Sequence, residues 1–176
     1  MNRIFRVISA LILVGVVAAC GSTPPARTTT VNKFRSYDGP PVTQIVVNKG
    51  DRRMHLVSGR TVLKSYNIST GNQPIGHKQY EGDGRTPEGT YFINRFNPNS
   101  RYHLSVGISY PNTQDANLAT LAGLRPGGDI MIHGLGPEGR AINRPDWTAG
   151  CIAVSDDEIE DIYAMLRPGV PIFIYP

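Results

Sequence analysis

Short runs of apolar residues, separated by glycine-containing or charged turns, make up most of the chain after residue 41. Residues 45–47 and 54–57 are such runs, joined by a turn at residues 49–51, and a third run covers residues 61–69. Runs of this length between turn residues are typical of β-strands, and short turns join strands that pair antiparallel. Four later stretches have the same character: residues 89–93, 103–109, 129–133 and 170–175. The pattern predicts a mainly β domain that begins with a β-meander.

One segment near the C-terminus follows a helical period instead. Apolar residues recur there at spacings of three and four: Ile159, Ile162, Tyr163 and Leu166. The preceding Ser155 and Glu158 have the spacing of a capping box, and Pro168-Gly169 would end the helix. We therefore predict one helix packed on the β core. The acidic residues of its first turn are interpreted as partners of the helix dipole, not as catalytic groups.

The first 19 residues differ from the rest, with two arginines followed by an apolar run over residues 7–19 that stops just before Cys20. The run of 13 residues is shorter than the ~20 that a helix needs to cross a bilayer. Its small final residues are typical of a cleaved secretory signal. The ending at Cys20 resembles the bacterial lipobox, which implies lipidation of Cys20 and anchoring to a membrane by several acyl chains. Ordinary cleavage nearby, with Cys20 incidental, is the alternative.

The leader also bears on localisation and domain boundaries. Because Gly21 follows Cys20, the resemblance implies the periplasmic face of the outer membrane if the cell is Gram-negative. Residues 20–41 are rich in Ser, Thr, Pro and Arg and cannot bury enough surface to fold. We therefore predict a lipoprotein signal peptide over residues 1–19, a flexible tether over residues 20–41 and one domain over residues 42–176. That length supports a single hydrophobic core.

Composition and charge narrow the class of protein. The chain has 19 glycines and 14 prolines among 176 residues, which favours a turn-rich, strand-rich domain. The formal net charge of +4 includes Arg3 and Arg6 of the leader. A balance this weak does not indicate nucleic-acid binding, so no nucleic-acid partner is expected.

The cysteine count draws attention to Cys151. If Cys20 carries lipid, Cys151 is the remaining thiol of an exported protein. It is either a small buried hydrophobic residue or a nucleophile. His133 lies 18 positions earlier, after an apolar strand candidate, and a histidine can take the proton of a cysteine. Gly150 permits close approach of a substrate carbonyl, and main-chain N–H groups beside it are candidates for an oxyanion hole.

These residues resemble the signature of the L,D-transpeptidase catalytic domain, the YkuD family. The matching positions are His133, Gly134, Thr148, Gly150, Cys151 and Ile152, with the upstream turn Thr86-Pro87-Glu88-Gly89. The resemblance covers residues 42–176. It implies a YkuD-like β-sandwich with one helix following the catalytic loop.

The resemblance also implies a reaction. Cys151 would attack the carbonyl of an L,D-peptide bond next to diaminopimelate in a peptidoglycan stem peptide, forming a thioester. His133 would transfer protons, and the carbonyl of Gly134 would orient its ring. An amine would resolve the thioester into a cross-link or an attachment to an acceptor protein, whereas water would give hydrolysis. The expected function is an L,D-transpeptidase of cell-wall cross-linking or remodelling. The alternatives are an L,D-carboxypeptidase or another cysteine hydrolase, and a non-catalytic wall-binding lipoprotein.

Substrate contacts are less defined, because Ala149 and Ala153 stand where many family members carry His and Arg or Asn. Candidate substrate-binding residues are Arg85 and Arg144 for stem-peptide carboxylates, Trp147 as a platform or as packing, and Thr148. The other histidines are scattered, and the sequence contains neither His-Glu-x-x-His nor Cys-x-x-Cys. We therefore expect no metal site and no cofactor.

Overall fold

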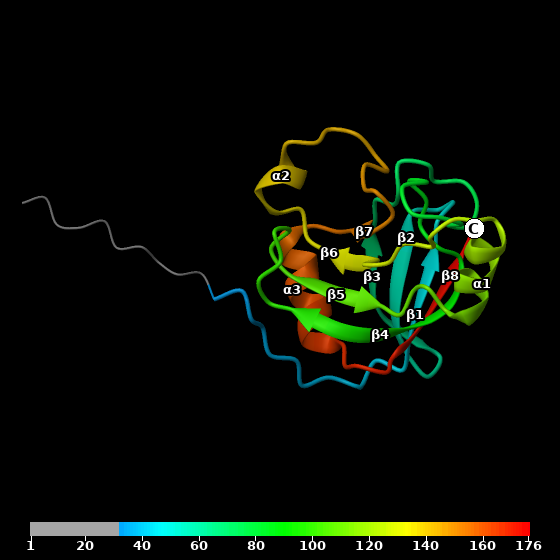
Figure 1. Ribbon diagram of the computed structural model, residues 1–176. Helices are drawn as coiled ribbons and strands as arrows, with labels where there is room; N and C mark the ends of the chain where they lie inside the picture. Colours follow the sequence, from blue (N-terminus) through cyan, green and yellow to red (C-terminus); the bar gives the residue numbers. More distant parts are fainter. Residues whose placement is uncertain (1–31) are drawn as a thin grey trace, which may run out of the picture. The chain divides into compact units, whose positions relative to one another are not determined.

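The computed structural model describes residues 32–176, so the predicted leader and Cys20 lie outside the described residues (Figure 1). Within the described part, no helix has both the length and the apolar composition that a membrane span requires. The compact unit begins at Asn32, ten residues before the predicted start of the domain at Val42.

Eight strands and three helices occur among residues 32–176. In chain order they are β1 Gln44–Asn48, β2 Arg53–Ser58, β3 Thr61–Asn67, β4 Gly89–Asn97, β5 Ser105–Ile108, α1 Thr113–Leu121, β6 Met131–His133, α2 Gly136–Arg140, β7 Ile152–Ala153, α3 Asp156–Met165 and β8 Pro171–Tyr175.

The strands form one curled sheet in the order β3-β2-β1-β8-β4-β5-β6-β7. The first three strands pair antiparallel, as the turns between them predict. β8 lies between β1, which it pairs with in parallel, and β4, which it pairs with antiparallel. Just after β3, the backbone of Ser69 exchanges two hydrogen bonds of 2.9 and 2.8 Å with Ala153 in β7. The two ends of the sheet therefore meet, and the predicted mainly β, YkuD-like fold is confirmed.

Helix α3 has the predicted cap and apolar face. The Ser155 hydroxyl accepts from the main-chain N–H of Glu158, whose carboxylate accepts from the N–H of Ser155. Ile159, Ile162 and Leu166 are fully buried, because their common face packs against β5 and β6 (Figure 1). This helix follows the predicted catalytic loop and fixes one wall of the core.

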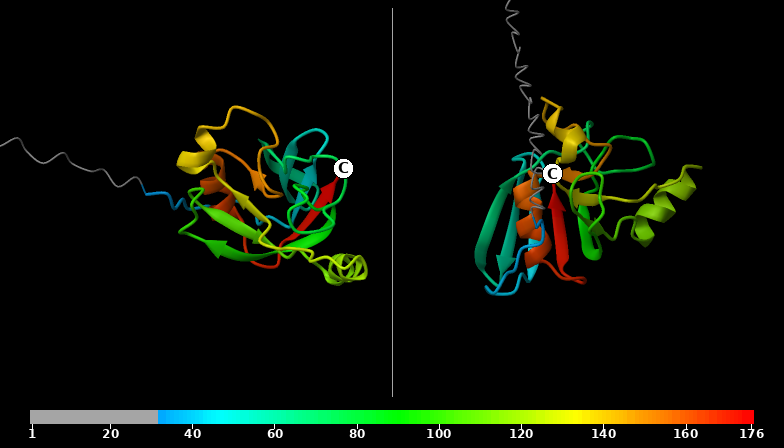
Figure 2. Two further views of the ribbon diagram at one scale, coloured as in Figure 1. Left: turned by 45° about the horizontal axis from the view of Figure 1, so that its top comes forward. Right: turned by 90° about the vertical axis from the view of Figure 1, so that its left-hand side faces the viewer.

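Three elements were not predicted: α1, α2 and β7. α1 is capped by Asn112, whose side chain forms a capping box with Asp115, so the spacing of these two residues was a readable signal. The helix projects from the body of the domain in both views of Figure 2, and it buries only Asp115 and Ala119. It therefore has no apolar stripe to produce a helical period. β7 has two residues, too few to show alternation.

Candidate active site

The parallel pairing of β6 and β7 brings the predicted base and nucleophile together. His133 is aligned with Ala153, and Ile132 with Ile152. Aligned residues of neighbouring strands point to the same face, and side chains alternate along each strand. Cys151 comes two residues before Ala153, just outside β7, and the same alternation continued by one residue predicts that its thiol lies on the face of the His133 ring. Two very short strands thus unite residues 18 positions apart in the sequence.

The His133 ring is held in one orientation and one tautomer. Its Nδ1 lies 2.6 Å from the carbonyl oxygen of Gly134, and because a carbonyl can only accept, Nδ1 carries the proton. In the neutral ring, Nε2 is then the free base. Tyr102 stacks on the ring at 4.5 Å with an angle of 29° between the planes, and Trp147 meets it edge-on at 5.8 Å. Burial lowers the pKa of His133, an effect that the Gly134 carbonyl partly opposes.

Gly134 is packed too tightly to carry a side chain. A Cβ at this position would lie 2.6 Å from the Asp156 carboxylate and 2.8 Å from the Tyr102 carbonyl oxygen. The same Asp156 oxygen accepts hydrogen bonds of 2.8 Å from the N–H groups of Leu135 and Gly136. Asp156 was interpreted as a partner of the helix dipole. The structure shows that it also fixes the backbone after His133, a long-range contact that no local spacing signals.

The Cys151 thiol is partly buried beside β6. Burial raises the pKa of Cys151 above its ordinary value of 9.0, as does the charge of Asp129. The main-chain N–H of Met131 and the charges of Lys78 and Arg95 act in the opposite direction. Burial disfavours the charged form of both candidate groups, which favours a neutral thiol at Cys151 and a neutral imidazole at His133 in the resting protein.

The loop before Cys151 is organised by Thr148. Its hydroxyl donates to the Cys151 carbonyl at 2.7 Å and accepts from the Gly150 N–H at 3.1 Å. Gly150 has a φ of +137°, and a Cβ there would lie 2.7 Å from the Arg85 carbonyl oxygen. Glycine is therefore required by both conformation and space. Thr148 was predicted to bind substrate; its buried hydroxyl is committed to the loop.

The start of this loop is anchored to the sheet by Asp146. The buried carboxylate accepts from the N–H and the hydroxyl of Thr70, both at 3.1 Å. The Arg52 guanidinium contacts the other carboxylate oxygen at 2.6 Å. This network holds the start of the loop over residues 147–151 in place. No pattern in the sequence indicated it.

A cavity of about 230 Å³ adjoins the Cys151 thiol. It is lined by Lys78, Glu81, Gly82, Gly127, Gly128, Asp129, Ile130, Ala149 and Cys151. Lys78 is 3% exposed and is paired at 2.8 Å with the equally buried Asp83. A larger cavity of about 310 Å³ lies along α1 and also touches Lys78, but it does not include Cys151. The smaller cavity is the candidate reaction site, because Cys151 lines it.

The other predicted substrate-binding residues are placed differently. The Trp147 ring packs against Tyr102 and His133. The Arg85 guanidinium lies beside Gly76. The part of Arg85 that approaches the loop before Cys151 is its main-chain carbonyl, which lies next to Gly150. Arg144 is exposed. The cation in the wall of the Cys151 cavity is Lys78, which was not among the predicted substrate-binding residues. Among residues 32–176, no cluster of three or more His, Cys, Asp or Glu side chains could hold a metal ion.

The neutral resting pair predicts how the thiol reacts. In a Cys20→Ala background, which leaves one thiol, alkylation of Cys151 by iodoacetamide should rise about tenfold per pH unit from pH 7 to 9, because only the thiolate reacts. The rate is measured by mass spectrometry, with the urea-unfolded chain as the reference for a normal thiol. A rate that is already constant below pH 7 would mean a resting thiolate and would contradict this assignment.

Comparison with known proteins identifies the family of this chain. Residues 42–174 match the YkuD family, the L,D-transpeptidase catalytic domain. YafK of Escherichia coli strain K12 is 29% identical over 190 residues, covering 99% of this chain and 71% of YafK.

Two solved structures share the fold. The helical cell shape determining protein Pgp2 from Campylobacter jejuni superimposes with a TM-score of 0.60 at 27% identity, over 81% of this chain. Bd1075 of Bdellovibrio bacteriovorus does so with a TM-score of 0.53 at 23% identity, also over 81% of this chain. In each case the match spans 50% of the other protein, so this chain corresponds to about half of their length.

Proposed function

The chain belongs to the L,D-transpeptidase catalytic-domain family, YkuD, and from this premise we propose that it acts on peptidoglycan stem peptides through a thioester on Cys151. The observation that carries the proposal is the orientation of His133. Its Nδ1–H is bound to the Gly134 carbonyl, which leaves Nε2 to take a proton on the face where Cys151 projects. A nucleophile, a base and a group that orients the base are the minimum for cysteine catalysis.

In the first half of the reaction, Cys151 Sγ attacks the carbonyl carbon of an L,D-peptide bond while His133 Nε2 takes the thiol proton. The carbon–nitrogen bond then breaks, and the imidazolium returns that proton to the leaving amine. The acyl group remains on sulfur as a thioester. The Gly150 N–H is already engaged by Thr148, so the Cys151 N–H is the main-chain donor that we assign to the oxyanion.

In the second half, an acceptor attacks the thioester carbonyl and gives its proton to His133, and the thiolate leaves and is reprotonated. An amine acceptor on a second stem peptide or on a protein gives transpeptidation, and water gives hydrolysis. Ala149 lines the cavity and Ala153 is buried beside His133, so neither side chain offers a polar contact to the acceptor. We propose transpeptidation as the reaction, with hydrolysis as the alternative that the experiment below separates.

We further propose that the protein is exported and anchored by lipid on Cys20, at the periplasmic face of the outer membrane if the cell is Gram-negative. The basic start, the short apolar run and the small residues before Cys20 support this localisation. It would place the domain beside peptidoglycan. A contribution to cell shape is part of the proposal, since Pgp2 is a helical cell shape determining protein.

The test is incubation of the full chain, purified in detergent, with purified muropeptides, followed by mass spectrometry of the products. Cysteine-dependent cross-linking or exchange of the terminal residue is expected, and Cys151→Ala is the matched control. Shortened stems without exchange would establish a hydrolase instead. Unchanged muropeptides together with an unreactive Cys151 thiol would overturn the enzymatic proposal and leave a wall-binding lipoprotein.

A further inference from the structure

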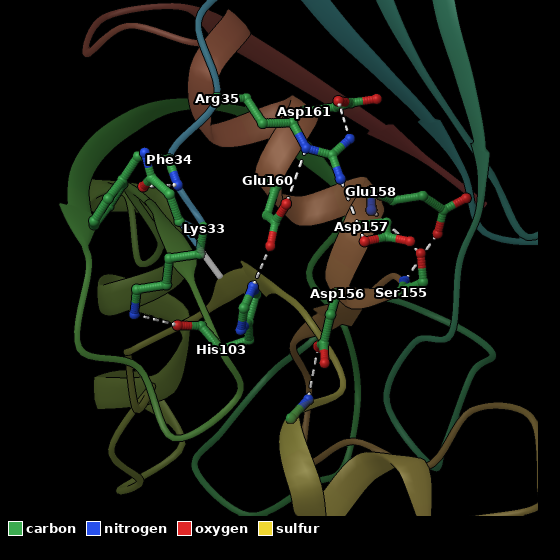
Figure 3. Close-up of polar contacts among 12 residues, drawn as sticks. Lys33, Phe34, Arg35, His103, Ser155, Asp156, Asp157, Glu158, Glu160 and Asp161 are labelled. Atoms are coloured by element: carbon green, nitrogen blue, oxygen red, sulfur yellow. Dashed lines mark hydrogen bonds and ion pairs between the residues drawn. The ribbon is translucent and has the colours of Figure 1, made fainter. Parts of the chain in front are cut away.

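Residues Lys33, Phe34 and Arg35, here called the strap, lie along α3 in Figure 3. The Arg35 guanidinium contacts three carboxylates of that helix. Its Nε is 2.9 Å from Glu160, its Nη1 is 2.6 Å from Asp161 and its Nη2 is 3.3 Å from Asp157. A planar guanidinium that uses three of its nitrogens in this way fixes the direction of the strap on the helix.

The strap also contacts the loop between β4 and β5. The Lys33 ammonium donates to the carbonyl oxygens of Pro98 and His103, the latter at 3.3 Å. The Phe34 ring lies 6.1 Å from the ring of Tyr163 on α3. The strap thus bridges a helix and a loop that do not adjoin in the sequence.

Glu160 joins the strap to that loop. It is 7% exposed, and its second carboxylate oxygen lies 2.7 Å from Nε2 of His103 (Figure 3). His103 has a φ of +74°, a left-handed conformation that a non-glycine residue keeps only when its surroundings hold it. The Glu160 contact and the Lys33 bond to the His103 carbonyl are two such restraints.

The loop then reaches the catalytic histidine. Tyr102, which precedes His103, stacks on the His133 ring at 4.5 Å. The carbonyl of Leu104, which follows His103, accepts the N–H of Gly134 at 3.2 Å. His103 therefore lies between Tyr102, which packs on the His133 ring, and Leu104, whose carbonyl binds the backbone just after His133. A change in its conformation would move both contacts.

We propose that Arg35, Glu160 and His103 are positioning residues, through which the strap holds Tyr102 against His133 and keeps the base in its catalytic orientation. The relevance of this contact to catalysis rests on the proposed function. The proposal gives a structural role to residues 33–35, which the sequence predicts to be part of the flexible tether over residues 20–41. A domain that begins at residue 42 would lack the strap and hold His133 less firmly.

The test uses the full chain in detergent, with matched variants of two cations that contact the same helix, α3. Arg35→Ala removes the strap contact with Glu160 and Asp161. Lys64→Ala removes another cation, 3.4 Å from Asp161, that does not contact Glu160 or His103. Glu160→Gln breaks the link from the other side. Arg35→Lys keeps the charge without the planar fork and should restore part of any loss.

The fluorescence of Trp147 reports on His133 without requiring turnover. Trp147 is the single tryptophan of the chain and meets the His133 ring at 5.8 Å, so protonation of His133 should quench its fluorescence. His133→Asn should abolish that pH transition and so identifies it. If the strap holds the buried ring, Arg35→Ala and Glu160→Gln should shift the midpoint upward by about 0.5 pH, because looser packing weakens desolvation.

The result that supports the proposal is a midpoint shifted upward in Arg35→Ala and Glu160→Gln, with Lys64→Ala at the wild-type midpoint. An unshifted midpoint in Arg35→Ala, even with a lower melting temperature, would show that the strap only stabilises the fold and would overturn the proposal. Equal shifts in Lys64→Ala would trace the effect to helix charge and would also overturn it. Failure of muropeptide turnover in the wild type would overturn the proposed function, whereas the fluorescence titration would still test the strap.

Discussion

Turnover of stem peptides is expected to fall by about a thousandfold when His133 is replaced by asparagine, within the 10²–10⁴ that a positioned general base contributes. Burial raises the pKa of Cys151 and lowers that of His133, so the resting thiol depends on the histidine at the moment of attack. The loss should fall on kcat more than on KM. Raising the pH to 10 should recover part of the rate, because hydroxide then forms the thiolate directly.

Stability measurements separate this chemical role from a structural one. A histidine whose pKa is lowered by folding stabilises the protein above its ordinary pKa of 6.5, and this contribution is lost as the pH falls toward the folded value. The melting temperature of the wild type should therefore drop more between pH 7 and pH 5 than that of His133→Asn. If His133→Asn kept the wild-type kcat, His133 would not be the base.

Gly134→Ala is expected to reduce kcat by about a hundredfold, because a displacement of roughly 1 Å at a reacting group has an effect of that size. Its Cβ would come within 2.6 Å of Asp156, 2.8 Å of the Tyr102 carbonyl and 2.9 Å of Ile159. The collision would displace the carbonyl that orients Nδ1 of His133. Overpacking of this kind should also cost about 2 kcal/mol of stability, read from urea unfolding.

Gly50→Ala is the matched control for this substitution. The nearest neighbour of a Cβ at Gly50 would be the Pro176 carbonyl oxygen at 3.7 Å, an ordinary contact, in a turn far along the chain from the site. Its kinetics should equal those of the wild type. If Gly134→Ala also retains full kcat, then the packing around Gly134 does not set the orientation of the base.

The elements with local signals were predictable. The meander of β1, β2 and β3 follows from apolar runs separated by short turns, and α3 follows from its cap and its helical period. The insertion of β8 beside β1 was not, because it pairs Ile45 with Ile172 and nothing near either residue specifies the other. α1 was missed because a projecting helix lacks an apolar stripe.

The site divides in the same way. The chemical types of Cys151 and His133, with their glycines, indicated a nucleophile and a base. The groups that orient them were hidden, because Tyr102, Asp146 and Asp156 act through contacts between distant segments. Lys78 stands in a long connection between β3 and β4, where no period distinguishes a buried cation from a solvated one.

The central position of β8 has a consequence for how the domain is made. Among the described elements, β8 is the last to leave the ribosome, yet it joins β1 to β4 in the middle of the sheet. Until residues 171–175 emerge, the strands on either side of it have no common partner. Pairings between residues so far apart in sequence also slow folding, since a long loop must close before the contact forms. The sheet is therefore completed only after the polypeptide has been synthesised through its final strand.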